Sequence, residues 1–202
     1  MKNIIKKIWS YSVFQPVKKG EKEALEYKKN SIQFLYGEIT EEGTVKMIKY
    51  LRENELVKGD WNILDIGSGF GKMVMRLALE KDITESHGIE LSKSKNDKAI
   101  QNFNELIETF PEFPKEKVKL IEGNIKTNNI KKYYDIVFHN SIAWLSESVF
   151  RVNDEFKDSI HISTKAPSSI KDDRIKRIDT INVKFSWSKT EKGTPIYIYK
   201  LN

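Results

Sequence analysis

The chain lacks cysteine altogether and has only three histidines among its 202 residues. Without cysteine it can form no disulfide bond, no thiolate-ligated zinc site and no cysteine nucleophile. The histidines (His87, His139 and His161) are scattered along the chain, and their spacing predicts no metal site. No apolar run approaches the ~20 residues that a helix needs to cross a membrane. These absences exclude disulfide-stabilised scaffolds, cysteine-dependent enzymes and proteins with membrane-spanning helices.

A secretion signal is absent from the first residues as well. Residues 1–9 show neither the continuous apolar core nor the small-residue cleavage site of a signal peptide. We therefore expect a soluble, intracellular protein with no membrane partner.

Positive charge is concentrated at the start of the chain. The net charge is +6, and residues 1–35 carry the lysines at positions 2, 6, 7, 18, 19, 22, 28 and 29. Such a segment can contact a nucleic acid or a nucleoprotein through phosphate attraction, or it can be an ordinary solvated surface. Ile4, Ile5, Ile8, Trp9 and Phe14 need something to pack on. We predict a partly helical basic segment over residues 1–35 and one domain over residues 36–202.

The hydrophobic pattern of residues 36–202 alternates between strand and helix periods. Thr40 is the expected N-cap of a first helix, which ends near Gly59 and turns Val45, Ile48 and Leu51 inwards. The further helices are expected over Lys72–Glu80, from Ser92 to Pro111, and over about Glu147–Phe156. The strands are expected over Trp61–Ile66, Ser86–Glu90, Val118–Ile121, Tyr134–Phe138, Ile160–Thr164, Thr180–Trp187 and Pro195–Leu201.

This order predicts an α/β fold with a mostly parallel seven-stranded sheet, a C-terminal antiparallel hairpin and helices on both faces. It is the Rossmann-like arrangement of class I methyltransferases.

A glycine-rich turn follows the first strand of this domain. Gly67, Gly69 and Gly71 let the backbone bend sharply and approach a ligand closely. Glu90, at the end of the second strand, can accept hydrogen bonds from both hydroxyls of a ribose. Together they indicate an adenosine-containing cofactor.

Asp65, two residues before the first glycine, narrows the choice of cofactor. Its carboxylate would repel a pyrophosphate but suits the cationic amino-acid end of S-adenosylmethionine. The turn also differs from the G-x-G-x-x-G of nicotinamide enzymes, and no G-x-x-x-x-G-K-[ST] motif is present. Asn124, after the third strand, is placed to read the adenine edge. The predicted cofactor is therefore S-adenosyl-L-methionine.

Four further segments carry a resemblance to a known family. They are Tyr36-Gly37-Glu38 before the first helix, Phe138 to Trp144 with an Asn-x-x-Ala-aromatic pattern, Ser163 to Pro167 after the fifth strand, and Phe185-Ser186-Trp187-Ser188 in the hairpin. With the glycine turn they resemble the disruptor-of-telomeric-silencing type of lysine methyltransferase, which modifies histone H3 on the nucleosome without a SET domain. The resemblance runs from about Tyr36 to the C-terminus.

The resemblance implies a role for each matching residue. Asn140 would anchor the reacting ends, and Trp187 and Tyr197, with Ile142 and Trp144, would line a channel for the substrate lysine. An apolar channel suits this reaction, because a lysine amine with a pKa near ~10.4 must lose its proton before it can accept a methyl group.

The resemblance also implies cofactor contacts. Tyr36, Gly37 and Glu38 would form a loop over the methionine end of the cofactor, with Thr40 following. Lys72 and Asn124 stand where the family has a glutamine and an aspartate, and both remain candidate cofactor-binding residues.

The sequence predicts an S-adenosylmethionine-dependent protein lysine N-methyltransferase acting on a histone or another basic, nucleic-acid-associated protein. Its location would be the nucleus if the source is a eukaryote or a nuclear virus. Two alternatives stay open, because this fold hosts many functions: a methyltransferase for RNA or a small molecule, and a cofactor-binding module without catalysis.

Overall fold

The computed structural model describes residues 1–11, 37–125, 127, 130, 133–140, 156–166 and 174–201. Strands and helices alternate along them until a hairpin closes the chain. The elements are α1 (Lys2–Ser10), α3 (Glu41–Glu53), β1 (Trp61–Ile66), α4 (Lys72–Ala78), β2 (Ile83–Glu90), α5 (Lys93–Thr109), η1 (Lys115–Lys117), β3 (Val118–Glu122), β4 (Ile136–His139), β5 (Ile160–Ser163), β6 (Ile175–Val183) and β7 (Thr194–Leu201).

The strands form one seven-stranded sheet in the order β3-β2-β1-β4-β5-β7-β6. β1 lies parallel to β2 and β4, β3 is parallel to β2, and β5 is parallel to β4. Only β7 runs antiparallel to its neighbours β5 and β6. The order reverses between β1 and β4, and in open α/β sheets ligands bind at the carboxyl ends of the strands at such a point. The predicted fold class is confirmed.

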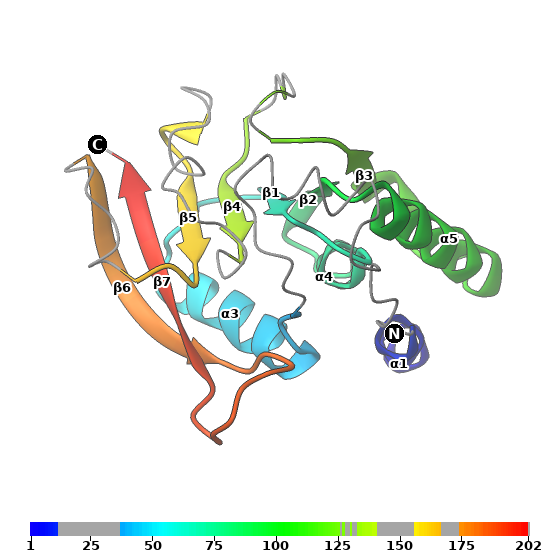
Figure 1. Cartoon of the computed structure of the whole chain (residues 1–202), viewed down its shortest axis with the longest axis horizontal. Coiled ribbons are helices and arrows are strands. Elements are labelled where there is room, and N and C mark those ends of the chain that lie inside the picture. Colours follow the sequence, from blue (N-terminus) through cyan, green and yellow to red (C-terminus); the bar gives the residue numbers. More distant parts are fainter. Residues whose placement is uncertain are drawn as a thin grey trace, which may run out of the picture.

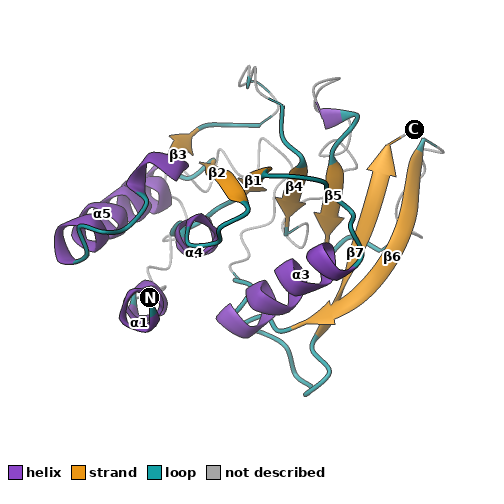
Figure 2. Cartoon of the chain, turned by 180° about the vertical axis from the view of Figure 1, so that it is seen from behind, coloured by secondary structure: helices purple, strands orange, loops and turns teal. Residues whose placement is uncertain are grey.

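Helices α3, α4 and α5 lie along one face of the sheet, with α1 beyond α4 and α5 (Figure 1). The view from behind shows the same layering, with the long β6–β7 hairpin curving away at one edge (Figure 2). Of the helix expected over about Glu147–Phe156, only Phe156 is among the described residues. None of the described helices is long and apolar enough to cross a membrane.

The two faces of the sheet carry separate apolar cores, because side chains alternate along each strand. Ile63 and Ile136 face α3 and α4 in one cluster, which includes Leu51 and Leu77. Leu64 and Val137 face the other way, where they pack with Tyr134 and Phe156. β1 and β4 are therefore packed on both faces of the sheet. This packing fixes the position of the end of β1, where the glycine turn begins.

Helix α3 begins at Thr40 as predicted, because the Thr40 hydroxyl accepts a hydrogen bond from the Gly43 N–H. The predicted inner face was partly wrong. Ile48 and Leu51 are buried, but Val45 is 44% exposed, and Met47 is buried in its place. A helix repeats every 3.6 residues, so the buried stripe runs through positions 44, 47, 48 and 51.

The first residues form helix α1, which packs on the domain. Ile4 and Ile8 are buried in a third cluster with Met75 of α4 and Leu106 of α5. This is the packing that the apolar residues of the basic segment require. Residues 12–36 lie outside the described part, so the division into a segment over 1–35 and a domain over 36–202 stays a prediction.

The hairpin differs from the predicted strand limits. β6 begins at Ile175 and ends at Val183, so Phe185 and Trp187 lie after the strand. There the Phe185 N–H donates to the Ser188 hydroxyl, and the Ser188 N–H donates to the Phe185 carbonyl. These bonds turn the chain over residues 185–188. The residues after Val183 therefore leave the β6–β7 pairing and can pair with another segment of the chain.

Candidate active site

The turn from β1 to α4 is built on glycines with a left-handed backbone. Gly67, Gly69 and Gly71 have φ values of 80°, 55° and 74°. Residues with a Cβ rarely adopt these values, so the predicted need for glycine is met. The N–H groups of Gly67 and Ser68 donate to the carbonyl of Ile89, 2.8 and 3.2 Å away, which attaches the turn to β2.

Glu90 fixes the same turn from the end of β2. One carboxylate oxygen accepts from the Gly69 N–H at 2.9 Å, and the other accepts from the Ser92 N–H at 2.8 Å. The side chain is buried. Glu90 therefore holds the glycine turn against the start of α5.

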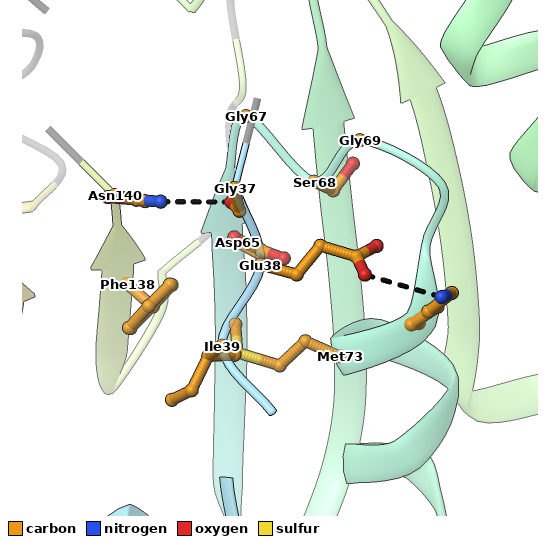
Figure 3. Close-up of a pocket in the computed structure, with 11 residues that line it drawn as sticks. Gly37, Glu38, Ile39, Asp65, Gly67, Ser68, Gly69, Met73, Phe138 and Asn140 are labelled. Atoms are coloured by element: carbon orange, nitrogen blue, oxygen red, sulfur yellow. Dashed lines mark hydrogen bonds and ion pairs between the residues drawn. The ribbon is translucent and has the colours of Figure 1, made fainter. Parts of the chain in front are cut away.

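A small pocket opens beside this turn (Figure 3). Its free volume is about 40 Å³, little more than that of one water molecule. The lining residues are Gly37, Glu38, Ile39, Asp65, Gly67, Ser68, Gly69, Lys72, Met73, Phe138 and Asn140.

Acidic groups dominate the electrostatics of this pocket. Burial, together with the nearby carboxylates of Glu90 and Glu38, raises the pKa of Asp65 to about 8. Near neutral pH, Asp65 is thus mostly protonated, and a cation placed beside it would favour its ionised form. The Lys72 ammonium lies 3.3 Å from the Glu38 carboxylate and is the one basic group among the described residues that line the pocket.

Residues 37–40, which we name the strap, cover the pocket and pair with the chain after β6. The Thr40 N–H donates to the Lys184 carbonyl at 2.9 Å, and the Ser186 N–H donates to the Glu38 carbonyl at 2.8 Å. Ile39 and Phe185 form an antiparallel bridge. Residues 184–186, which follow β6, therefore hold the strap beside the glycine turn.

The strap brings Asn140 and Trp187 together. The Asn140 side-chain amide donates to the Gly37 carbonyl at 3.1 Å, and its oxygen accepts from the Thr164 hydroxyl at 3.1 Å. On the other side of Gly37, the Trp187 ring packs so closely that an added Cβ would meet three of its ring carbons. Trp187 also stacks on Phe185, with ring centroids 4.3 Å apart. Segments more than a hundred residues apart thus meet at Gly37.

A family model described as "Histone methylation protein DOT1" matches residues 15–169 of the chain. The chain belongs to the DOT1 family. This confirms the predicted family. The match ends before Trp187, so the resemblance of the hairpin rests on its own residues. No curated protein matches the chain.

Solved structures with the same fold include a putative caffeoyl-CoA O-methyltransferase from Staphylococcus aureus. It is 16% identical, with a TM-score of 0.57, and the match covers 91% of this chain and 93% of that one. A mutant of MtNAS in complex with S-adenosylmethionine is 12% identical, with a TM-score of 0.55 and coverages of 78% and 61%. At such identities the likeness shows the fold alone.

The chain spans about half the length of two other matched structures. These are YjhP from E. coli and a SAM-dependent methyltransferase from Thiobacillus denitrificans. They are 22% and 20% identical, cover 61% and 62% of this chain, and have TM-scores of 0.48 and 0.47, with 48% of each matched.

Several residues of the predicted DOT1-type site line the pocket. They are Gly37, Glu38, Asp65, Gly67, Gly69, Lys72 and Asn140. Their individual roles toward cofactor and substrate stay predictions. Glu90 and Gly71 belong to the same turn without lining the pocket, since Glu90 holds Gly69 and Gly71 precedes α4.

Other predicted residues are not among those that line the pocket. The Thr40 hydroxyl caps α3 and donates to the Lys184 carbonyl, which gives it a structural role. Asn124 follows β3 and is half-buried, and it is not among the pocket residues. Tyr197, on β7, is paired with Ser163 and Thr180 and is likewise not among the pocket residues. Tyr36, Ile142 and Trp144 lie outside the described residues.

Sequence reasoning missed some residues that shape the site. Ile39 and Met73 supply its apolar wall, and Thr164 orients the Asn140 amide. The position of Met73, directly after Lys72, was a signal that could have been used. Trp9 carried no such signal, yet its ring lies near the Lys72 ammonium, 5.8 Å from the ring centroid.

Proposed function

We propose that this DOT1-family chain is an S-adenosylmethionine-dependent protein lysine N-methyltransferase. Its substrate is a histone or another basic, nucleic-acid-associated protein. The observation that carries the proposal is the meeting of Asn140, Gly37 and Trp187 beside an acidic pocket at the switch point of the sheet. Family membership supports the same conclusion.

The residues around the pocket fit S-adenosylmethionine. Asp65 and Glu38 provide carboxyl groups for a ligand with a cationic end, and burial, followed by the neighbouring carboxylates of Glu90 and Glu38, raises the pKa of Asp65. Gly67 and Gly69 leave the turn without side-chain bulk, and Glu90 lies at a strand end where it can hold a ribose. When bound, the cofactor supplies an electrophilic methyl group.

The chain contributes two features to the proposed methylation of lysine: an apolar surface for the substrate side chain and an amide that can align its amine. Trp187, which stacks on the buried Phe185, adds apolar surface beside Gly37, and exclusion of water from such a surface lowers the pKa of an incoming lysine amine. Asn140 is a neutral amide whose two ends are both held, by Gly37 and by Thr164. It can therefore position a reacting amine without adding charge, and alignment supplies much of the catalysis of such a transfer.

A nucleic-acid contact fits the basic start of the chain. Lys2 and Lys6 are exposed on α1, whose apolar side is packed against the domain. Exposed lysines on a docked helix can contact phosphates of a nucleoprotein substrate. In a eukaryotic source or a nuclear virus this substrate places the enzyme in the nucleus.

The test is a transfer assay with S-adenosylmethionine carrying a labelled methyl group. Core histones, nucleosomes, RNA and a mixture of small metabolites are offered in parallel, and labelled protein is hydrolysed to its amino acids. We expect labelled N-methyl-lysine from the basic proteins. Label found only in RNA or small molecules would point to the alternative methyltransferase, and cofactor binding without any transfer would point to a non-catalytic module.

A further inference from the structure

Lys72 places a positive charge inside the pocket that the proposed function assigns to a cationic ligand. Its side chain is only 6% exposed, and its Glu38 partner is 19% exposed. Their 3.3 Å contact crosses the pocket from α4 to the strap, and the dashed line from Glu38 marks it (Figure 3). A buried pair of this kind is costly to break, because each charge would lose its partner without regaining water.

A second contact holds Lys72 from outside the pocket. The Trp9 ring of α1 lies near the same ammonium, with the nitrogen 5.8 Å from the ring centroid, a distance at which the ring face attracts a cation. Helix α1 is itself fixed by the burial of Ile4 and Ile8. Lys72 is therefore held from two sides rather than free to swing into solvent.

The charge balance of the lining residues follows from this arrangement. Glu38 and Asp65 are the acids and Lys72 is the base among them. Because the Lys72 ammonium pairs with Glu38, it offsets part of the negative charge that the acids of the pocket would otherwise offer to a cation.

S-adenosylmethionine carries a sulfonium, whereas S-adenosylhomocysteine, the product of methyl transfer, has a neutral thioether at the same position. Building on the proposed function, we propose that Lys72 is a specificity-determining residue whose ammonium shifts the pocket's preference from the charged cofactor toward the neutral product. The enzyme is consequently more sensitive to inhibition by S-adenosylhomocysteine than the same pocket would be without the Lys72 charge.

The size of this effect can be set from charge–charge interaction. A charge on a partly buried side chain is poorly screened from a charged ligand in the same pocket, so we set the effect at a tenfold change in Kd, which corresponds to ~1.4 kcal/mol. We therefore expect removal of the Lys72 charge to lower the ratio Kd(S-adenosylmethionine)/Kd(S-adenosylhomocysteine) by about tenfold.

The experiment is calorimetric titration of the full chain with each compound separately. Lys72→Gln and Lys72→Met remove the charge in two ways, Lys72→Arg keeps it, and Lys49→Gln removes a charge from the exposed side of α3 as a matched control. Thermal unfolding of each variant establishes that it folds. If one of the two uncharged variants does not fold, the other is used in its place. The ratio should fall in both, and stay within about twofold in Lys72→Arg and Lys49→Gln.

An unchanged ratio in the uncharged variants would overturn the inference. So would an equal loss of affinity for both compounds, because that result would mean that Lys72 holds a part common to both, such as the carboxylate. If the unmodified chain binds neither compound, the proposed function itself fails. These outcomes are distinguishable in one set of titrations.

Discussion

Gly37→Ala should disable the site while leaving most of the fold intact. The added Cβ would lie closer than 3.0 Å to two carbons of the Trp187 ring, Cζ3 and Cε3, and 3.2 Å from a third, Cη2. Carbon atoms prefer separations of about 3.5–4.0 Å, so the ring or the strap must move by roughly 1.5 Å. The Gly37 carbonyl also holds Asn140, and this bond would be disturbed by the same movement.

The two consequences of this change differ in size. Overpacking of this kind costs about 1–3 kcal/mol of stability, which lowers the melting temperature of a protein of this length by roughly 2–10 °C. A displacement of about 1 Å near reacting groups can reduce a rate on the order of a hundredfold. Methyl transfer to histones should therefore fall far more than the folded fraction, as measured by labelled-methyl incorporation beside thermal unfolding.

Gly59→Ala is the matched control. Gly59 has a φ of 74° and open space around it, so alanine there costs about 1–2 kcal/mol of backbone strain without touching the site. It should lose similar stability and keep its activity. If both variants lose activity in the same proportion, or if Gly37→Ala remains fully active, then the packing of Gly37 between Asn140 and Trp187 does not matter for function.

Two further predictions concern protons. Burial lowers the pKa of His161 to about 4, so the unfolded chain takes up a proton that the folded chain refuses as pH falls below 6.5. Relative to His161→Leu, the protein should lose roughly 2 kcal/mol of unfolding free energy between pH 8 and pH 5, measured by urea denaturation, and a pH-independent difference would contradict this. The second follows from the pKa of Asp65, raised to about 8 by burial, Glu90 and Glu38: affinity for S-adenosylmethionine should rise as pH rises from about 6 to about 7.5, because the cation favours ionised Asp65 while the ligand's α-amino group, with a pKa of ~7.7–8.0, still carries its charge. Calorimetry should find this rise reduced in Asp65→Asn, and equal pH profiles would refute it.

The glycine turn could be predicted because its signal is local. The stretch from Asp65 to Gly71 reports a strand, a turn and a helix start within a few residues, and its backbone angles require glycine. Glu90 follows at the end of the next strand, at the spacing that the fold imposes. Local patterns of this kind need no knowledge of distant contacts.

The strap and its partners could not be predicted in the same way. Ile39 and Phe185 pair across almost the whole domain, and the sequence only shows that Phe185 and Trp187 suit a strand. The strand predicted over Thr180–Trp187 therefore runs past Val183, where β6 ends. The chain turns there through a hydrogen bond to the Ser188 hydroxyl, which the hydrophobic pattern does not report. The contact between Trp9 and Lys72 likewise depends on how α1 packs, which no periodicity reports.

The most direct test of the central claim is nucleosome methylation by the unmodified chain and by Asn140→Ala. Asn140 fixes the strap to β4 through the Gly37 carbonyl, and alanine removes both of its hydrogen bonds. After incubation with labelled S-adenosylmethionine and hydrolysis of the histones, we expect N-methyl-lysine from the unmodified chain and at least a hundredfold less from the variant. Undiminished methyl-lysine from Asn140→Ala, or no methyl-lysine from either protein, would contradict the assignment of this site.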